Sequence, residues 1–199
     1  QLVLLDSAHL NEEEARRRTP HKPGHGRHKP TAAPLYSILD AVRSFEFFGR
    51  TAHYDRPLDL VPGIRATFID AGHILGSASI RLELTQASRR RSVLFSGDLG
   101  NAGRPLLRDP AVPPRSDVVV IETTYGDRLH KPIGPSVEEL YAAIRDTFVR
   151  GGNVVIPTFA LERAQEVLFY LREGLESNKL PRGMPVFLDS PMAISATEI

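Results

Sequence analysis

Residues 71–77 read AGHILGS and form the most informative stretch of this sequence. Two comparable stretches follow it at nearly equal intervals, FSGDLG at residues 95–100 and ETTYGDR at residues 122–128. Each of them places one His, Asp or Glu in a glycine-bearing turn beside an expected strand. Imidazole and carboxylate groups are metal ligands, so such residues at strand ends are what a metal-dependent hydrolase requires.

Taken singly, His73, Asp98 and Glu122 each have an ordinary structural explanation. These are a loop histidine bonded to the backbone, an Asx-turn, and a helix-start acid or ion pair. Taken together they favour a site, because three strand ends of one sheet converge on one edge. Two metal ions about 4 Å apart can activate water and hold the oxygens of a phosphoryl group. We therefore expect the three side chains to meet at a common rim, although two ligands do not complete a metal site.

The composition excludes several classes of protein. The sequence contains no cysteine, which rules out disulfides and zinc sites built from thiolates. Hydrophobic residues make up 41%, which is enough for a core. No apolar run reaches the roughly 18 residues of a membrane span, and no signal peptide is visible. We therefore expect a cytoplasmic protein without a membrane partner.

Positive charge is concentrated in residues 16–29, which hold arginines and lysines and no acid. Such a run is most often a solvated loop, and contact with a polyanion is the less common explanation. The histidines outside the three motifs that we considered are weaker metal-ligand candidates, namely His9, His21, His25, His28 and His53.

The first fifty residues predict a short α/β segment. The continuous apolar run at residues 2–5 favours a buried strand, and residues 11–18 favour a helix with Asn11 as its N-cap. Prolines, glycines and basic residues indicate a loop at 19–34. Helical periodicity returns at residues 37–45.

Strands dominate the next part of the sequence. We predict strands at residues 64–69 and 78–84, the second with strict alternation of apolar and polar residues. A polar hairpin turn at 86–91 leads into a strand at 92–95. The continuous apolar run at 118–121 predicts a strand that is covered on both faces.

From residue 136 helices alternate with strands, which implies a parallel sheet. Ser136 and Glu139 have the spacing of a capping box at a helix start, and the glycines at 151–152 end that helix. The later elements that we expect are a strand at 153–156, a helix at 162–173 and a strand at 186–188.

At these residues the chain resembles the β-CASP branch of the metallo-β-lactamase-fold nucleases. This group includes bacterial RNA-processing exonucleases, RNase J and the endonuclease subunit of the eukaryotic pre-mRNA 3′-end machinery. The resemblance covers nearly the whole chain. Besides the three motifs it rests on LDSAH at 5–9, RHKP at 27–30, PLY at 34–36, IPTFALERAQE at 156–166 and LDSPMA at 188–193.

The resemblance implies an α/β fold, the C-terminal part of an αββα metallo-β-lactamase sandwich followed by the start of an inserted α/β domain. On this interpretation residues 1–150 belong to the metallo-β-lactamase domain and residues 151–199 begin the β-CASP domain. The main metal motif of the family, H-x-H-x-D-H, does not occur in this sequence, and neither do its two later histidines. We therefore interpret the chain as part of a longer enzyme.

Residue roles also follow from the resemblance. It implies that His73 is a metal ligand and that Asp98 is both a bridging metal ligand and a catalytic residue. Glu122 corresponds to a catalytic acid that pairs with a histidine supplied later in the chain. The residues that we expect to contact RNA are Thr158, Arg163 and Ser190.

The resemblance finally implies a metal-dependent ribonuclease, which hydrolyses RNA phosphodiesters with a hydroxide activated by two divalent metals. Zinc is the expected metal and manganese is possible on the same ligands. RNA is the expected partner, a homo-oligomer is possible, and residues 1–199 alone are expected to be inactive. One alternative is a non-catalytic RNA-binding or scaffold paralogue of the same fold. Another is a small-molecule metallo-hydrolase, which the segment at 156–166 disfavours.

Overall fold

The computed structural model describes residues 1–18 and 33–198. The chain divides into two compact units, Gln1–Thr51 and Ala52–Ile199. Within the described ranges, no helix is both long and apolar enough to cross a membrane.

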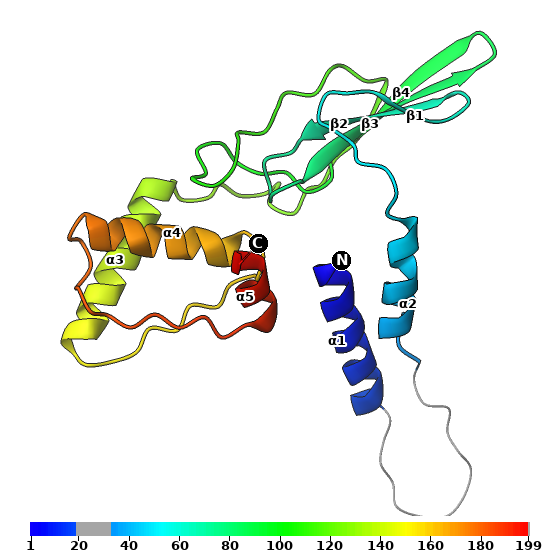
Figure 1. The fold of residues 1–199 in the computed structure, drawn as a ribbon. Coiled ribbons are helices and arrows are strands. Elements are labelled where there is room, and N and C mark those ends of the chain that lie inside the picture. The colour runs from blue at the N-terminus through cyan, green and yellow to red at the C-terminus, as the bar shows by residue number, and fades with distance from the viewer. Residues whose placement is uncertain (19–32, 199) are drawn as a thin grey trace, which may run out of the picture. The chain divides into compact units, whose positions relative to one another are not determined.

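The first unit consists of α1 (Leu2–Arg18), α2 (Ile38–Ser44) and the 3-10 helix η1 (Phe45–Phe47). Helices α1 and α2 contact each other (Figure 1). Helix α2 begins with a capping box, because Ser37 Oγ accepts the Asp40 N–H while the Asp40 carboxylate accepts the Ser37 N–H. The helix predicted at residues 37–45 is confirmed.

The strand predicted at residues 2–5 is wrong, because these residues form the first turn of α1. Leu5 donates its N–H to the Gln1 carbonyl, so the backbone is already helical there. Periodicity alone does not separate a short apolar strand from a helical segment. Asn11 lies inside α1, where its side chain donates to the Ser7 carbonyl at 2.8 Å, so it is not an N-cap. Most of the loop predicted at 19–34 lies outside the described residues.

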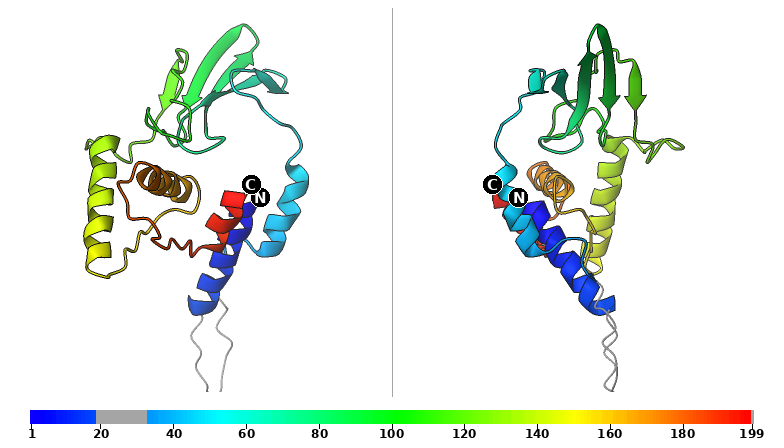
Figure 2. Two further views of the ribbon diagram at one scale, coloured as in Figure 1. Left: turned by 60° about the vertical axis from the view of Figure 1, so that its left-hand side comes forward. Right: turned by 90° about the vertical axis from the view of Figure 1, so that its right-hand side faces the viewer.

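A five-stranded sheet, drawn in cyan to green in Figure 2, forms the first half of the second unit. Its strand order is β1-β2-β3-β4-β5. The first four strands pair antiparallel, and β5 pairs parallel with β4. The strands are β1 (Leu58–Val61), β2 (Ile64–Asp70), β3 (Ala78–Gln86), β4 (Arg89–Phe95) and β5 (Val118–Val120).

The sheet confirms the strands predicted at residues 64–69, 78–84 and 92–95. Strand β3 is longer than expected and reaches Gln86, and β4 begins at Arg89, so the hairpin turn is tighter than the sequence indicated. The prediction that residues 118–121 are covered on both faces is wrong for the described chain. Val119 is 53% exposed and Ile121 is 58% exposed. The strand pairs with β4, but no helix of the described chain packs extensively on either of its faces.

Two helices, α3 (Ile133–Val149) and α4 (Arg163–Glu176), follow the sheet and cross each other steeply (Figures 1 and 2). A compact core lies between them, formed by Tyr141, Ile144, Leu171 and Leu180. The expected capping box is not present, because α3 begins one turn earlier and Ser136 Oγ donates to the Pro132 carbonyl. Gly151 has φ +65° directly after the helix and ends it as predicted.

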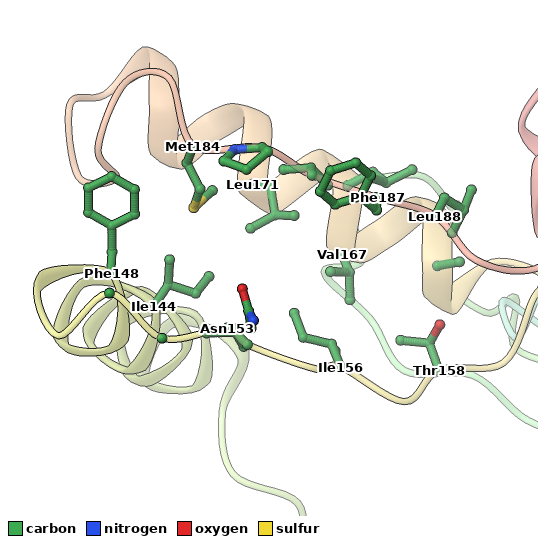
Figure 3. Close-up of a pocket in the computed structure, with 17 residues that line it drawn as sticks. Ile144, Phe148, Asn153, Ile156, Thr158, Val167, Leu171, Met184, Phe187 and Leu188 are labelled. Carbon is green, nitrogen blue, oxygen red and sulfur yellow. The ribbon is translucent and has the colours of Figure 1, made fainter.

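The two later strands predicted at 153–156 and 186–188 are not part of a sheet in the described chain. A β-strand exists only where it pairs, and apolar composition alone does not supply a partner. Both segments instead line an apolar cavity of about 620 Å³ beside α3 and α4. Figure 3 shows side chains such as Ile144, Val167 and Met184 around this cavity. Helix α5 (Pro191–Glu198) ends the described chain.

Candidate active site

The turn that carries His73 leaves the end of β2 and is held by a serine. Ser77 Oγ accepts the backbone N–H groups of His73 at 3.0 Å and Ile74 at 3.2 Å. The Ser77 N–H in turn donates to the Ile74 carbonyl. Ser77 is therefore a turn residue, and the His73 imidazole is half exposed at the surface.

Asp98 follows β4 in a second turn that touches the first. The Gly100 N–H donates to the Ala71 carbonyl at 2.9 Å. A Cβ atom on Gly100 would lie 1.7 Å from the Gly72 carbonyl oxygen, so only glycine permits this approach of the two backbones. As a result, His73 Nε2 lies 3.9 Å from Asp98 Oδ2.

Glu122 follows β5 and its carboxylate is bound by backbone donors. Its two oxygens accept the N–H of Leu99 at 3.1 Å and the N–H of Thr124 at 3.0 Å. The Leu99 N–H is the main reason that the pKa of Glu122 lies below the usual glutamate value, followed by Thr124 and, more weakly, the nearby His73. The Glu122 N–H itself donates to Ser96 Oγ at 2.9 Å.

The structure thus brings the three predicted side chains to the same end of the sheet. A shared ion requires its nitrogen and oxygen ligands to lie no more than about 4.2 Å apart, the sum of typical zinc–nitrogen and zinc–oxygen distances. The separation of His73 Nε2 and Asp98 Oδ2 meets this limit. Among the described residues, however, no group of three or more His, Cys, Asp or Glu side chains could hold an ion. The two donors fit part of a metal site.

The three residues predicted to contact RNA lie in different surroundings. Arg163, half exposed at the start of α4, lines a cavity of about 210 Å³ together with His73. Thr158 lies at the large apolar cavity instead (Figure 3). Ser190 caps α5, because its hydroxyl accepts the Ala193 N–H at 3.2 Å. Only Arg163 is therefore brought beside the His73 turn.

The cavity beside His73 also contains residues that the sequence did not reveal. Arg104 Nη1 donates to Glu166 Oε1 at 2.6 Å, and Arg163 Nη1 donates to the other Glu166 oxygen at 2.7 Å. Glu166 is only 5% exposed, so it is a buried anion between two cations. Nothing in the sequence indicated it, because Glu166 lies on the side of the predicted helix opposite to the apolar residues Ala164, Val167, Leu168 and Leu171.

Comparison with known proteins gives the family. No protein-family model matches the chain. Ribonuclease TTHA0252 of Thermus thermophilus is 37% identical over 96% of this chain and 46% of its own length. Endoribonuclease YSH1 of Kluyveromyces lactis is 35% identical over 80% of this chain and 20% of its own length. An RNase J-like protein of Methanocaldococcus jannaschii is 37% identical over 74% of this chain and 34% of its own length.

The chain belongs to the β-CASP branch of the metallo-β-lactamase-fold nucleases. The family resemblance and the mixed α/β fold class predicted from the sequence are confirmed. This β-CASP chain spans less than half the length of each of the three relatives. Membership of the family implies dependence on divalent metal without fixing which metal.

Proposed function

We propose that the full-length protein carrying this chain is a metal-dependent ribonuclease that hydrolyses RNA phosphodiesters. The observation that carries the proposal is the 3.9 Å approach of His73 Nε2 to Asp98 Oδ2, beside the ionised Glu122. The relatives support the substrate, since two of those compared are named as ribonuclease and endoribonuclease.

His73 and Asp98 would hold part of a site for two divalent ions, with zinc the expected metal and manganese the alternative. When bound, such ions lower the pKa of water and offset charge on the phosphoryl oxygens. The remaining ligands would come from outside residues 1–199. We accordingly propose that this segment alone neither holds two metal ions nor cleaves RNA.

Other residues of the chain would position the metal ligand, orient a histidine and bind the RNA backbone. Ser77 fixes the turn of His73, and thereby directs the imidazole toward Asp98. Glu122 stays ionised because backbone N–H groups bind it, so it can accept a hydrogen bond from a protonated histidine and orient that group. Arg163 has guanidinium donors free of Glu166 that suit a phosphate of the RNA backbone. We keep Thr158 and Ser190 as proposed RNA contacts.

We further propose the division into a metallo-β-lactamase part at residues 1–150 and the start of a β-CASP domain at 151–199. A cytoplasmic location and a homo-oligomer also stay predictions from the sequence.

The proposal is tested by replacing the two ligands in the full-length protein. We expect His73→Ala and Asp98→Ala each to abolish RNA cleavage while the thermal unfolding transition is retained, because each change removes a metal ligand. The measurement is the initial rate of cleavage of a labelled single-stranded RNA. His53→Ala is the matched control, since His53 is exposed and lies outside the site, and should cleave normally. Rates within a few-fold of the unmodified protein for both variants would remove these residues from the mechanism.

A further inference from the structure

The backbone at Glu162, just before α4, has a conformation that L-residues rarely adopt. Its φ is +63° and its ψ is −54°. The Arg163 N–H donates to the Leu161 carbonyl at 2.7 Å, which closes a three-residue γ-turn around Glu162. This form of γ-turn is rare and strained for residues other than glycine. A glutamate is therefore held here against the preference of its own backbone.

The conformation at Glu162 brings its side chain to the turn that carries His73. Glu162 Oε2 accepts the backbone N–H of Leu75 at 3.3 Å, across 87 residues of sequence. Leu75 lies in the turn that carries His73, where the N–H groups of His73 and Ile74 are already bound to Ser77 Oγ. The carboxylate thus binds the third consecutive N–H group of the turn. Three consecutive backbone N–H groups of the turn are therefore bound by two side chains. One side chain is Ser77 within the turn, and the other is Glu162 from a distant part of the sequence.

Hydrogen bonds and ion pairs hold the start of α4, which carries Glu162, in place. The Glu166 N–H donates to the Glu162 carbonyl at 2.8 Å, so the strained residue begins the first turn of the helix. The buried Glu166 carboxylate joins Arg104, in the loop after β4, to Arg163 at the helix start. Removing one partner from such a buried charged group is costly, which keeps the helix start in place. Glu162 therefore presents its carboxylate from a rigid element.

We propose that Glu162 is a positioning residue for the His73 turn. It holds the Leu75 N–H so that the imidazole of His73 stays directed toward Asp98, and the backbone strain at Glu162 persists because this turn places the carboxylate within reach of Leu75. This inference rests on the proposed ribonuclease function. It adds a positioning role for a residue that lies outside the three motifs.

The test compares three substitutions at position 162 in the full-length protein. Glu162→Ala removes the acceptor and keeps the strained backbone, whereas Glu162→Gly removes the acceptor and the strain together. Glu162→Gln keeps an oxygen that can accept from Leu75. We expect the Ala and Gly variants to lose kcat for RNA cleavage by at least about tenfold with little change in KM. The Gln variant should stay within about threefold of the unmodified protein.

Thermal unfolding separates positioning from a merely structural role. We expect Glu162→Gly to unfold at a higher temperature than Glu162→Ala, although both are equally impaired in kcat. Glu173→Ala, on the exposed side of the same helix, is the matched control and should be normal in both respects. Wild-type kcat in Glu162→Ala would overturn the proposal, and so would recovery of kcat in Glu162→Gly in step with its stability.

A second measurement does not depend on activity. Hydrogen exchange of the Leu75 amide should accelerate by about tenfold or more in Glu162→Ala and stay unchanged in Glu162→Gln, because only the first loses the acceptor. Unchanged exchange in Glu162→Ala would overturn the positioning role. If the unmodified protein cleaved no RNA, the proposed function would fail, and the exchange experiment would still decide the role of Glu162.

Discussion

Ser96 is the residue on which the two carboxylate-bearing turns converge. Its N–H donates to the Val120 carbonyl, and its own carbonyl accepts the Ser79 hydroxyl at 2.7 Å. Its hydroxyl accepts the Glu122 N–H at 2.9 Å and donates to the Gly97 carbonyl. Every polar group of this buried serine is thus paired, which fixes Glu122 relative to the turn of Asp98.

Replacing this serine should therefore destabilise the protein. Ser96→Ala leaves the Glu122 N–H without its acceptor, and we expect a loss of about 1–3 kcal/mol in the free energy of unfolding. Urea unfolding of the full-length protein measures it. The matched control is Ser116→Ala, a partly exposed position whose hydroxyl makes only a long hydrogen bond of 3.4 Å to the Pro114 carbonyl, and its substitution should change stability by less than about 0.5 kcal/mol. Equal stabilities for the two variants would show that the Ser96 hydroxyl does not organise the site.

Sequence motifs located some residues of the site and could not locate others. His73 and Asp98 were found because each lies in a local turn at a strand end, and the sheet brings such ends together. Arg104 and Glu166 pair across 62 residues of sequence, and nothing in the local pattern of either indicates the other. The γ-turn at Glu162 gave no signal, because glycine is the usual sign of a positive φ and here the residue is a glutamate.

Among the elements, β5 depends on a side chain that precedes it. The Asp117 carboxylate accepts the Ser92 N–H at 2.6 Å and the Ser92 hydroxyl at 2.9 Å, and Arg91 lies 3.3 Å away. These donors, the Ser92 N–H first, hold the pKa of Asp117 below its usual value. The contact joins the start of the parallel strand to β4.

This contact makes the stability of the sheet depend on pH. A carboxylate with a lowered pKa in the folded state stabilises the fold above the unfolded pKa of about 3.9, and the contribution is lost as pH falls through the folded value. We expect Asp117→Asn to unfold at lower urea concentration than the unmodified protein at pH 7, and the difference to shrink on acidification to about pH 3. A difference that stayed constant between the two pH values would contradict this account.

The strand predicted from alternation at residues 78–84 was reliable. Strand β3 alternates apolar and polar residues along its length, and this pattern has no helical interpretation. The continuous apolar runs were less informative, since residues 2–5 became helical and residues 153–156 and 186–188 joined no sheet in the described chain. A continuous apolar run predicts that a segment is buried. Whether the segment becomes a strand or a helix depends on the elements that pack against it.

At the scale of the whole molecule, the arrangement is a partial site on a well-defined scaffold. The β-CASP chain spans 46% of the Thermus thermophilus ribonuclease that it matches. It brings His73 and Asp98 to within 3.9 Å of each other, beside the backbone-bound carboxylate of Glu122 and near Arg163, whereas its described residues hold no group of three or more potential metal ligands. We therefore propose that the chemistry belongs to the full-length protein, and that residues 1–199 provide one side of the proposed metal centre.

The decisive measurement is the metal content of the purified protein by inductively coupled plasma mass spectrometry. We predict two divalent ions per chain in the full-length protein and in His53→Ala, and fewer than two in His73→Ala, in Asp98→Ala and in residues 1–199 alone. Two ions per chain in both the His73→Ala and the Asp98→Ala variants would contradict the claim that these side chains hold the metal centre.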